Sequence, residues 1–419
     1  MGSLSSTPAA AGDGAVPRER IIHSFTSGTD GSYPLSKLIF DSSGNLYSTA
    51  AGGGRYGFGV AFELSPIAAG GWEETILYNF DIRQGRELDG ISSLVFDTAG
   101  NLYGETYSGG TAGSGIVFEL SPGSGGAWTE KNLYVFSGGA DGRYPQGGLI
   151  VDGAGNLYGT TTHGGAANDG VVFTLRPIQS GGWSESVIHN FIGYPNDGEK
   201  PYGGVIFDKS GNLYGTTSQG GTGGCIHTPT CGTIYKLTPG SNGQWTEAIL
   251  HNFIGGSNDG GFPISTPTFD RYGNLFGTSE NGGGTDGCDL QGCGTAYELS
   301  PSGGGWNFAV LHVFPAYSGD GSAPTGSLVF DQAGNLYGST GGGGALGSWC
   351  LGGPSFCGTV FELTPTTGSG WTETVLHSFG AHQGDGTFPF DLVIDSVGNL
   401  YGPAYGGLAD RGVVYKVAP

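Results

Sequence analysis

A short string, Gly-Asn-Leu-Tyr (once with Phe in place of Tyr), occurs seven times along this 419-residue chain. The copies begin at Gly44, Gly100, Gly155, Gly211, Gly273, Gly334 and Gly398. Their spacing averages about 59 residues, close to the length of one supersecondary unit in a repeat protein. A chain with such regular self-similarity folds as an array of equivalent units, so the architecture of one unit decides the fold.

Each copy lies within a unit of four apolar runs that are rich in Val, Ile, Tyr, Phe and Thr. Run A ends in Asp, run B is the Asn-Leu-Tyr string, and run C is a Val-Phe-Glu-Leu-type run such as residues 117–122. Run D opens with Trp in six units and closes with His or Tyr, one residue and Phe. Short β-branched and aromatic runs separated by turn residues are typical of strands. We predict four antiparallel strands of about five to eight residues per unit.

The Asp-x-x-Gly-Asn spacing between runs A and B explains how this hairpin turns. In the first unit it is Asp41 to Asn45. The Asp carboxylate accepts backbone N–H bonds inside the turn, and Gly or Asn tolerates a positive φ there.

The two ends of the chain predict a closed ring. Run D at 21–25 has no A, B or C before it, and run C at 413–417 has no D after it. Together they complete one unit, and closure removes the open sheet edges. We predict an all-β, seven-bladed β-propeller with four antiparallel strands per blade, closed by the N-terminal strand, after a flexible leader at 1–20. The expected blades are 34–80, 90–136, 145–191, 201–253, 263–314, 324–379, and 389–419 with 21–27.

Composition and charge exclude several classes of protein. The 88 Gly and 21 Pro exclude long helices, whereas 12% aromatic and only 12% charged residues exclude disorder over most of the length. The formal charge of −21 argues against nucleic acid or anionic lipid as the partner. No apolar stretch reaches the ~20 residues of a membrane span. We expect a monomer.

The tandem Gly-Asn-Leu-Tyr-Gly-Thr-Thr units, followed by Gly-Gly and a Val-Phe-Glu-Leu strand, resemble the GloVer repeats of Gloeobacter and Verrucomicrobia. The resemblance covers about residues 21–419. It implies an exported bacterial propeller, often with a surface anchor, and it supplies no catalytic residue. No anchor or sorting segment is visible in this sequence.

Six cysteines form three close pairs in matched positions between runs B and C: Cys225/Cys231, Cys288/Cys293 and Cys350/Cys357. An even count in equivalent loops predicts three local disulfides. The alternative is a metal site at Cys225, His227 and Cys231, although no Cys-x-x-Cys spacing is present. Disulfides indicate a secreted, periplasmic or cell-surface location.

Many polar residues are explained by the repeat. The run A aspartates are expected to cap turns: Asp41, Asp97, Asp152, Asp208, Asp270, Asp331 and Asp395. The Asp-Gly pairs are also repeat features, with calcium as the less favoured reading: Asp30, Asp89, Asp141, Asp197, Asp259, Asp320 and Asp385. His in run D exchanges with Tyr and is therefore a packing position: His23, His189, His251, His312 and His377. We predict no cofactor and no metal.

Function is sought where one unit departs from the others. The D–A and B–C segments lie on the same face of a propeller and surround the channel mouth. Candidate catalytic residues there are Glu105, Tyr107, His163, Glu280 and Tyr405. Candidate ligand-binding residues are Lys37, Arg143, Tyr144, Gln146, Lys200, Tyr202, Gln219, Asn281 and Asp391. Aromatic faces mixed with amides, acids and a few bases favour a polar, uncharged ligand.

Three functions fit this pattern. The first is an exported binding module for a glycan or another small polar molecule. The second is an enzyme at the same mouth, using Glu105 and Glu280 as a glycosidase pair. In another enzyme reading, Tyr107, Tyr405 or His163 act as acid and base while Arg143 or Lys200 holds an anion. The third is a protein-interaction scaffold, because propellers host all of these activities.

Overall fold

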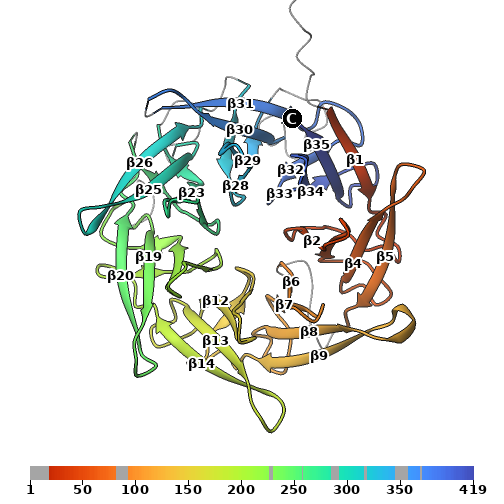
Figure 1. Ribbon diagram of the computed structural model, residues 1–419, viewed down its shortest axis with the longest axis horizontal. Coiled ribbons are helices and arrows are strands. Elements are labelled where there is room, and N and C mark those ends of the chain that lie inside the picture. Colours follow the sequence, from red (N-terminus) through yellow and green to blue (C-terminus); the bar gives the residue numbers. More distant parts are fainter. Residues whose placement is uncertain are drawn as a thin grey trace, which may run out of the picture.

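The computed structural model describes residues 18–81, 93–225, 230–256, 258–284, 292–315, 319–344, 357–368 and 370–419. Seven antiparallel sheets stand side by side around a centre, and the fold is the predicted seven-bladed β-propeller (Figure 1). Apart from one 3-10 turn, Ser124–Gly126, the described residues contain no helix. Accordingly, no described helix has the length and apolar character needed to cross a bilayer.

The four strand positions of the blades run from the ring centre outwards (Figure 1). Position A holds β2 (Ile39–Phe40), β6 (Val95–Phe96), β11 (Ile150–Val151), β16 (Ile206–Phe207), β22 (Thr268–Phe269), β28 (Val329–Phe330) and β33 (Val393–Ile394). Position B holds β3 (Leu46–Ala50), β7 (Leu102–Thr106), β12 (Leu157–His163), β17 (Leu213–Thr217), β23 (Leu275–Ser279), β29 (Leu336–Gly343) and β34 (Leu400–Gly406). Position C holds β4 (Val60–Pro66), β8 (Ile116–Pro122), β13 (Val171–Pro177), β19 (Thr233–Pro239), β25 (Thr295–Ser302), β30 (Thr359–Pro365) and β35 (Val413–Ala418). Position D holds β5 (Trp72–Asn79), β9 (Trp128–Val135), β14 (Trp183–Asn190), β20 (Trp245–Asn252), β26 (Gly305–Val313), β31 (Trp371–Ser378) and β1 (Arg18–Ser24).

Two features of the blades differ from the sequence prediction. Each strand A is only two residues long, shorter than the apolar run that contains it. Five blades also pair part of the D–A segment with the end of strand B or the residues after it. The extra strands are β10 (Arg143–Pro145), β15 (Gly198–Glu199), β18 (Gln219–Gly220), β21 (Gly260–Gly261), β24 (Asn281–Gly282), β27 (Gly321–Pro324) and β32 (Gly386–Pro389). We number the blades 1 to 7 from β2–β5 to β32–β35 with β1.

The A–B turns are built as predicted. In blade 1 the Asp41 Oδ1 atom accepts the N–H groups of Ser43 and Asn45 at 2.8 and 2.9 Å, and Gly44 has a φ of +87°. The Asn45 side chain donates to the second carboxylate oxygen at 2.9 Å. Equivalent bonds hold the other six run A aspartates, which are therefore turn caps.

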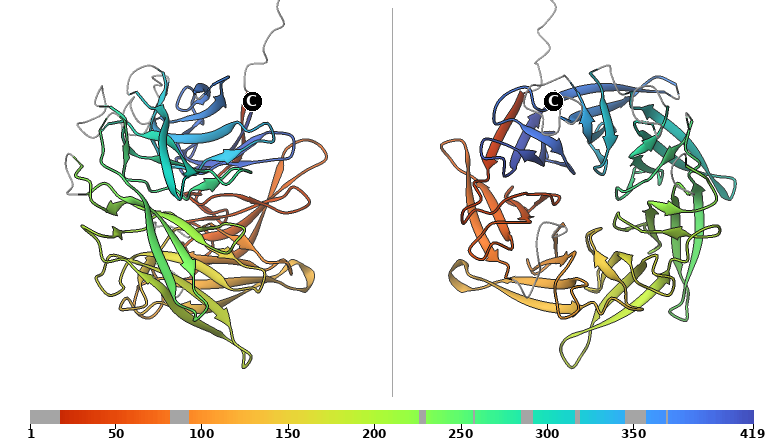
Figure 2. Two further views of the ribbon diagram at one scale, coloured as in Figure 1. Left: turned by 60° about the vertical axis from the view of Figure 1, so that its left-hand side comes forward. Right: turned by 180° about the vertical axis from the view of Figure 1, so that it is seen from behind.

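The ring is closed by the two ends of the described chain. Strand β1 pairs antiparallel with β35, from Arg18 opposite Ala418 to Ser24 opposite Val413. It thus supplies the outer strand of blade 7, and it begins earlier than the expected start at residue 21. Figure 2 shows β1 beside the C-terminal strand from both directions.

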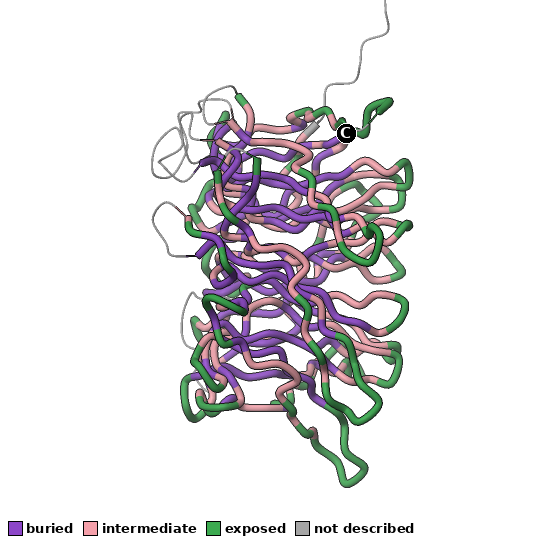
Figure 3. The backbone as a smooth tube through the Cα atoms, turned by 90° about the vertical axis from the view of Figure 1, so that its left-hand side faces the viewer, coloured by how far each residue is buried: buried purple, intermediate pink, exposed green. Residues whose placement is uncertain are grey.

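The hydrophobic core is divided among the blades and the interfaces between them (Figure 3). Phe118 of blade 2 is fully buried and meets Phe80 of blade 1 edge-on at 5.2 Å. Tyr47 of β3 packs edge-on against Phe96 of β6 at 5.1 Å. Such contacts recur around the ring, so each blade is stabilised by both neighbours.

Candidate functional site

A central cavity of about 490 Å³ lies where the chain enters the innermost strands. All seven blades contribute to its wall. The contributing segments are Leu35–Lys37 with Ile39, Ser93–Val95, Gln146–Ile150, Tyr202–Ile206, Ile264–Thr266, Thr325 with Ser327, and Phe390 with Asp391. The D–A segments of all seven blades therefore meet at the channel, whereas the B–C segments, which were predicted to share this mouth, contribute none of the described lining residues.

One backbone device fixes these D–A segments. In six blades one non-Gly residue of the D–A segment adopts a positive φ, which is uncommon for residues other than Gly. Its N–H donates at 2.6–2.9 Å to a carbonyl of the preceding blade, just before strand C. The donors are Tyr33, Tyr144, Lys200, Phe262, Ala323 and Phe388. The corresponding segment of blade 2 is outside the described residues. In these six blades the D–A segment is therefore hydrogen-bonded to the preceding blade.

The cavity wall itself is joined by hydrogen bonds between blades. The Gly204 N–H donates to Thr266 Oγ1 at 2.8 Å. The Ser327 N–H donates to Asp391 Oδ1 at 2.6 Å, so one oxygen of this carboxylate is used by the backbone. These bonds give the wall a fixed shape before any ligand arrives.

Four predicted binding residues line the cavity: Lys37, Gln146, Tyr202 and Asp391. Lys37 and Asp391 are the only charged side chains among its described lining residues. Two buried polar atoms have no hydrogen-bond partner among the described groups: Gln146 Nε2 and Thr325 Oγ1. A buried polar atom without a partner is costly, and a polar ligand in the cavity would supply one.

A second group of predicted residues lies together on the loop face of blades 2 to 4. Tyr107 and Tyr144 stack with ring centroids 4.6 Å apart, and the Arg143 guanidinium lies 5.1 Å from the Tyr144 ring. His163 meets Tyr144 edge-on at 5.7 Å and is opposite Arg143 in the β10–β12 ladder. We call Tyr107, Arg143, Tyr144, His163 and Lys200 the loop-face cluster.

The electrostatics of the loop-face cluster favour the neutral form of its histidine. Burial lowers the pKa of His163 below its ordinary value, and the positive charges of Arg143 and Lys200 lower it further. The Lys200 ammonium donates to Gln219 Oε1 at 2.6 Å. The cluster thus places two cations beside an imidazole whose pKa is lowered.

Tyr405 belongs to a different group. Its ring is 5.2 Å from Phe390, 6.0 Å from Tyr33 and 6.1 Å from Phe388. Arg411 donates to the Tyr33 hydroxyl at 2.6 Å. Because Phe390 also lines the cavity, this aromatic group borders it on the blade 7 side.

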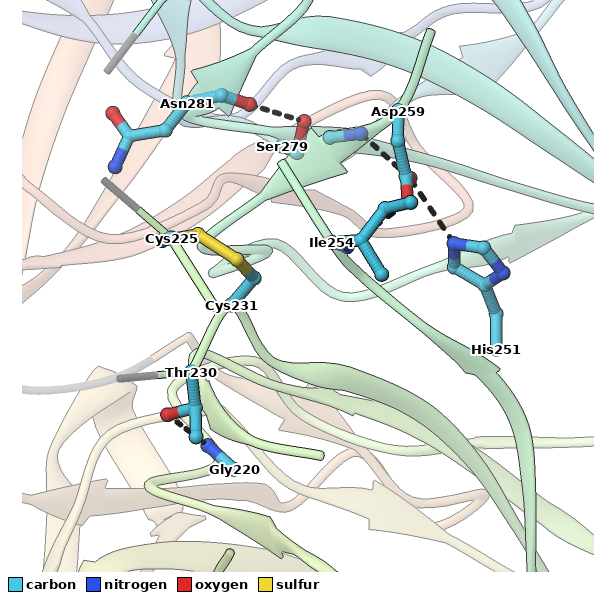
Figure 4. The surroundings of a disulfide bond; sticks show 10 residues. Gly220, Cys225, Thr230, Cys231, His251, Ile254, Asp259, Ser279 and Asn281 are labelled. Carbon is cyan, nitrogen blue, oxygen red and sulfur yellow. Dashed lines mark hydrogen bonds and ion pairs between the residues drawn. A yellow bond between two sulfur atoms is a disulfide. The ribbon is translucent and has the colours of Figure 1, made fainter. Parts of the chain in front are cut away.

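The two predicted catalytic carboxylates lie elsewhere. Glu105 is fully buried, and its Oε1 accepts the Gly148 N–H at 3.0 Å. At the equivalent position five of the other blades have Thr or Ser, and blade 7 has Pro403. Glu280 is not among the cavity-lining residues, and burial raises the pKa of its carboxyl. Asn281 lies on β24, and its carbonyl accepts the Ser279 hydroxyl at 2.9 Å (Figure 4).

One of the three predicted local disulfides lies between described residues. Cys225 and Cys231 are bonded, with their Cα atoms 5.3 Å apart (Figure 4). This bond removes both thiolates that the alternative metal site requires; its third residue, His227, lies outside the described residues. Cys293 and Cys357 are also disulfide-bonded, while their predicted partners Cys288 and Cys350 lie outside the described part.

Sequence reasoning missed the second role of the run D histidines. They do pack edge-on against the Phe two residues later, as His189 does against Phe191 at 4.6 Å. In four of the five, Nε2 also faces the aspartate of the Asp-Gly pair, at 3.1 Å for His251 and Asp259, whereas His23 Nε2 faces Glu74 at 3.6 Å. The matched spacing of His and Asp-Gly in successive units was the available signal.

Two further hollows, of about 520 and 510 Å³, lie on the opposite face. Both are lined by A–B turns, including Asp331, whose carboxylate already caps its turn. The walls of both hollows therefore consist mainly of residues that recur in every repeat unit. The central cavity, in contrast, is lined by several residues that differ between blades.

Comparisons with known proteins agree with the architecture. The family model described as the Gloeobacter/Verrucomicrobia repeat matches residues 11–225 and 178–415. No curated protein has a sequence that matches the chain significantly. An ancestral GH74 enzyme is 11% identical with a TM-score of 0.53, and the match covers 92% of this chain and 47% of that one.

The extracellular domain of a protein described as a one component system from B. thetaiotaomicron is 12% identical with a TM-score of 0.50. That match covers 91% of this chain and 38% of the other. This chain therefore spans less than half the length of both structures. At these identities the likeness shows the propeller fold and nothing finer.

Proposed function

Because the chain belongs to the Gloeobacter/Verrucomicrobia repeat family, we propose that it is an exported binding protein that holds a small, polar, largely uncharged ligand such as a sugar in its central cavity. The observation that carries this proposal is the cavity of about 490 Å³ to which all seven blades contribute. A volume of this size is typical of small-molecule sites. Export is supported by the disulfides, which persist in oxidising compartments.

The lining favours a neutral, hydroxyl-rich molecule over an ion. A single Lys and a single Asp leave the described wall without net charge. Tyr202, which is 37% exposed, offers a ring face for stacking, and Gln146 offers an amide for directional hydrogen bonds. Stacking combined with hydrogen bonding is the chemistry that recognises a sugar ring.

Calorimetric titration of the chain against neutral mono- and disaccharides, with uronic acids and amino sugars as charged analogues, tests the proposal. We expect a neutral sugar to bind more tightly than its charged analogues. Gln146→Ala and Tyr202→Ala should each weaken binding about tenfold, which corresponds to 1.4 kcal/mol. Tyr272→Ala is the matched control, because Tyr272 is exposed in an A–B turn on the other face. Equal losses in Tyr202→Ala and Tyr272→Ala would contradict the proposal.

The loop-face cluster favours a second candidate function, an acid–base enzyme acting on an anionic substrate. His163, whose pKa is lowered, lies beside Arg143 and Lys200, and such a group has the composition of a base next to an anion site. Turnover of carboxylate-bearing sugars that is lost in His163→Gln, with binding of the same sugars lost in Arg143→Met, would support it. Since Glu105 is buried in an interface, the Glu105–Glu280 pair is not proposed as the catalytic machinery.

A further inference from the structure

The strand D histidines take part in a repeated arrangement across the blade interfaces. At three interfaces the histidine and the Asp of the following Asp-Gly pair face a Glu that stands two residues after the Trp position of the next strand D. In three copies the three ligand atoms lie within 4.8 Å of one another. These interface triads are His189/Asp197/Glu247, His312/Asp320/Glu373 and His377/Asp385/Glu19.

The first interface triad has the spacing of an open coordination site. His189 Nε2 lies 3.4 Å from Asp197 Oδ2 and 3.6 Å from Glu247 Oε1, beyond the usual length of a charged hydrogen bond. Ligand atoms bonded at 2.0–2.1 Å to one tetrahedral ion are about 3.3 Å apart. Both His189 Nε2 and Glu247 Oε1 are buried, and the Asp197 carboxylate of the same triad interacts with both side chains.

The surroundings hold these ligands in place. Asp197 Oδ2 accepts the Ile192 N–H at 2.9 Å, and Oδ1 accepts the Gly198 N–H at 2.6 Å. The His189 ring is fixed edge-on by Phe191. Second partners of this kind orient metal ligands. In the other two interface triads the Glu Oε1 atom, of Glu373 or Glu19, is likewise buried. The histidine lies closer to its aspartate there, at 3.0 Å for His312 and Asp320 and at 3.3 Å for His377 and Asp385.

We propose that each interface triad binds one first-row divalent cation of the Zn²⁺ type, which clamps two adjacent blades. One imidazole nitrogen and two carboxylate oxygens form a set that suits Zn²⁺, with the fourth position open to water. The −21 net charge of the chain attracts cations to these sites. The triad with Glu19 joins β1 to blade 6, so its ion would fasten the ring at its closure.

At two other blade interfaces one residue of the triad is replaced by an aromatic residue. Between blades 4 and 5, Phe308 stands in the Glu position and stacks on His251 with the centroids 3.9 Å apart. Between blades 2 and 3, Tyr134 stands in the His position and donates to Asp141 at 3.1 Å. These copies show that the fold accepts Tyr for His and Phe for Glu at the interface.

A proton is the competing occupant of each interface triad. Burial raises the pKa of Glu247 to about 8 and the pKa values of Glu19 and Glu373 to about 7. A protonated Glu would satisfy its neighbours without any ion. The two occupants differ in an observable way, because only a cation has a stoichiometry and a spectrum.

Titration of the untagged, chelator-treated full chain with Co²⁺, followed by Zn²⁺ competition, tests the proposal. We expect three equivalents of Co²⁺ with the strong visible absorption of tetrahedral Co²⁺, displaced by Zn²⁺. His189→Tyr, His312→Tyr and His377→Tyr should each remove one equivalent. His251→Tyr, at the interface closed by Phe308, is the matched control and should remove none.

Folding of each variant is checked by circular dichroism. Glu247→Phe provides a second variant, which copies the Phe308 side chain of the neighbouring interface, and it too should lose one equivalent. The proposal is overturned if the wild-type chain binds no Co²⁺. It is equally overturned if the triple His→Tyr variant keeps the wild-type count, since the ions then bind elsewhere. Neither result bears on the ligand in the central cavity, which is measured separately.

Discussion

The Glu105 carboxylate of β7 accepts a hydrogen bond from the Gly148 backbone N–H at 3.0 Å, and this bond ties blade 2 to the cavity wall of blade 3. Glu105→Ala leaves that N–H without this acceptor inside a packed interface. We expect a loss of about 2 kcal/mol in the free energy of unfolding, measured by urea denaturation. Glu105→Gln retains an acceptor oxygen and should cost less.

The matched control is Thr160→Ala at the equivalent position of blade 3, where Thr160 Oγ1 donates to the Gly203 carbonyl at 3.0 Å. It should cost about 1 kcal/mol, the typical value for one neutral hydrogen bond. If Glu105→Ala is as stable as the wild-type chain, the interface role assigned to Glu105 is wrong.

Ring closure makes the first strand essential for stability. Deletion of residues 1–27 removes β1 and the fully packed Phe25, and it leaves β35 with an open edge. We expect a large fall in melting temperature and association at higher concentration, because unpaired edges promote pairing between chains. Scattering and thermal melts measure both. Deletion of 1–17 is the control, and equal behaviour of the two deletions would exclude the closure.

A smaller change tests the same closure without removing the strand. Phe25→Ala should cost about 3 to 5 kcal/mol, as for other fully buried aromatic residues. Phe80→Ala, at the equivalent position of blade 1, should cost a similar amount because Phe80 is equally buried. A negligible effect of Phe25→Ala alone would mean that β1 does not pack against the ring in solution.

Stability should decrease as the pH rises from mildly acidic to alkaline. Burial, followed by repulsion from Asp30, raises the pKa of Glu74 to about 8 from an ordinary value of 4.5, and His23 is its other close partner. The folded state therefore holds a proton that the unfolded state has lost. The stabilisation is complete below the unfolded pKa and is lost as the pH rises through the folded pKa.

We expect Glu74→Gln to remove part of this dependence. After discounting for partial exposure, the difference between wild type and variant should change by about 1 to 2 kcal/mol between pH 5 and 9. Denaturation midpoints across this range measure it. Glu73→Gln, at the exposed neighbouring residue, is the control. Parallel pH curves for wild type and Glu74→Gln would contradict the assigned proton.

The disulfide between Cys225 and Cys231 closes a short loop in blade 4. Replacing both cysteines by Ser should lower the free energy of unfolding by about 2 kcal/mol, because the loss of this link frees the unfolded chain. The double variant compared under oxidising and reducing conditions measures the effect. A wild-type chain whose melting temperature does not respond to reductant would contradict it.

The repeat predicted the fold well because each unit carries its own turn chemistry. The Asp41 to Asn45 spacing fixes the A–B hairpin through local hydrogen bonds that a single sequence reveals. The extra pairing of β10 with β12 was not predictable in this way. It depends on Tyr144, whose positive φ is stabilised by a carbonyl of another blade.

The candidate site was predicted in part for the same reason. Lys37, Gln146, Tyr202 and Asp391 lie just before strand A, so the topology alone brings them to the channel. Glu105 shows the limit of this reasoning. Glu105 stands where most blades have Thr or Ser, and this difference suggested a functional role. Whether the side chain at this position faces the channel or the next blade depends on packing between blades, which the sequence does not reveal.

The most direct test of the account is a crystal structure of the chain soaked with the neutral sugar that binds most tightly in the calorimetric panel. The account predicts density for the sugar in the central cavity, in contact with Gln146 and Tyr202. Density confined to the loop-face cluster or to the opposite face, with the cavity unchanged, would contradict it.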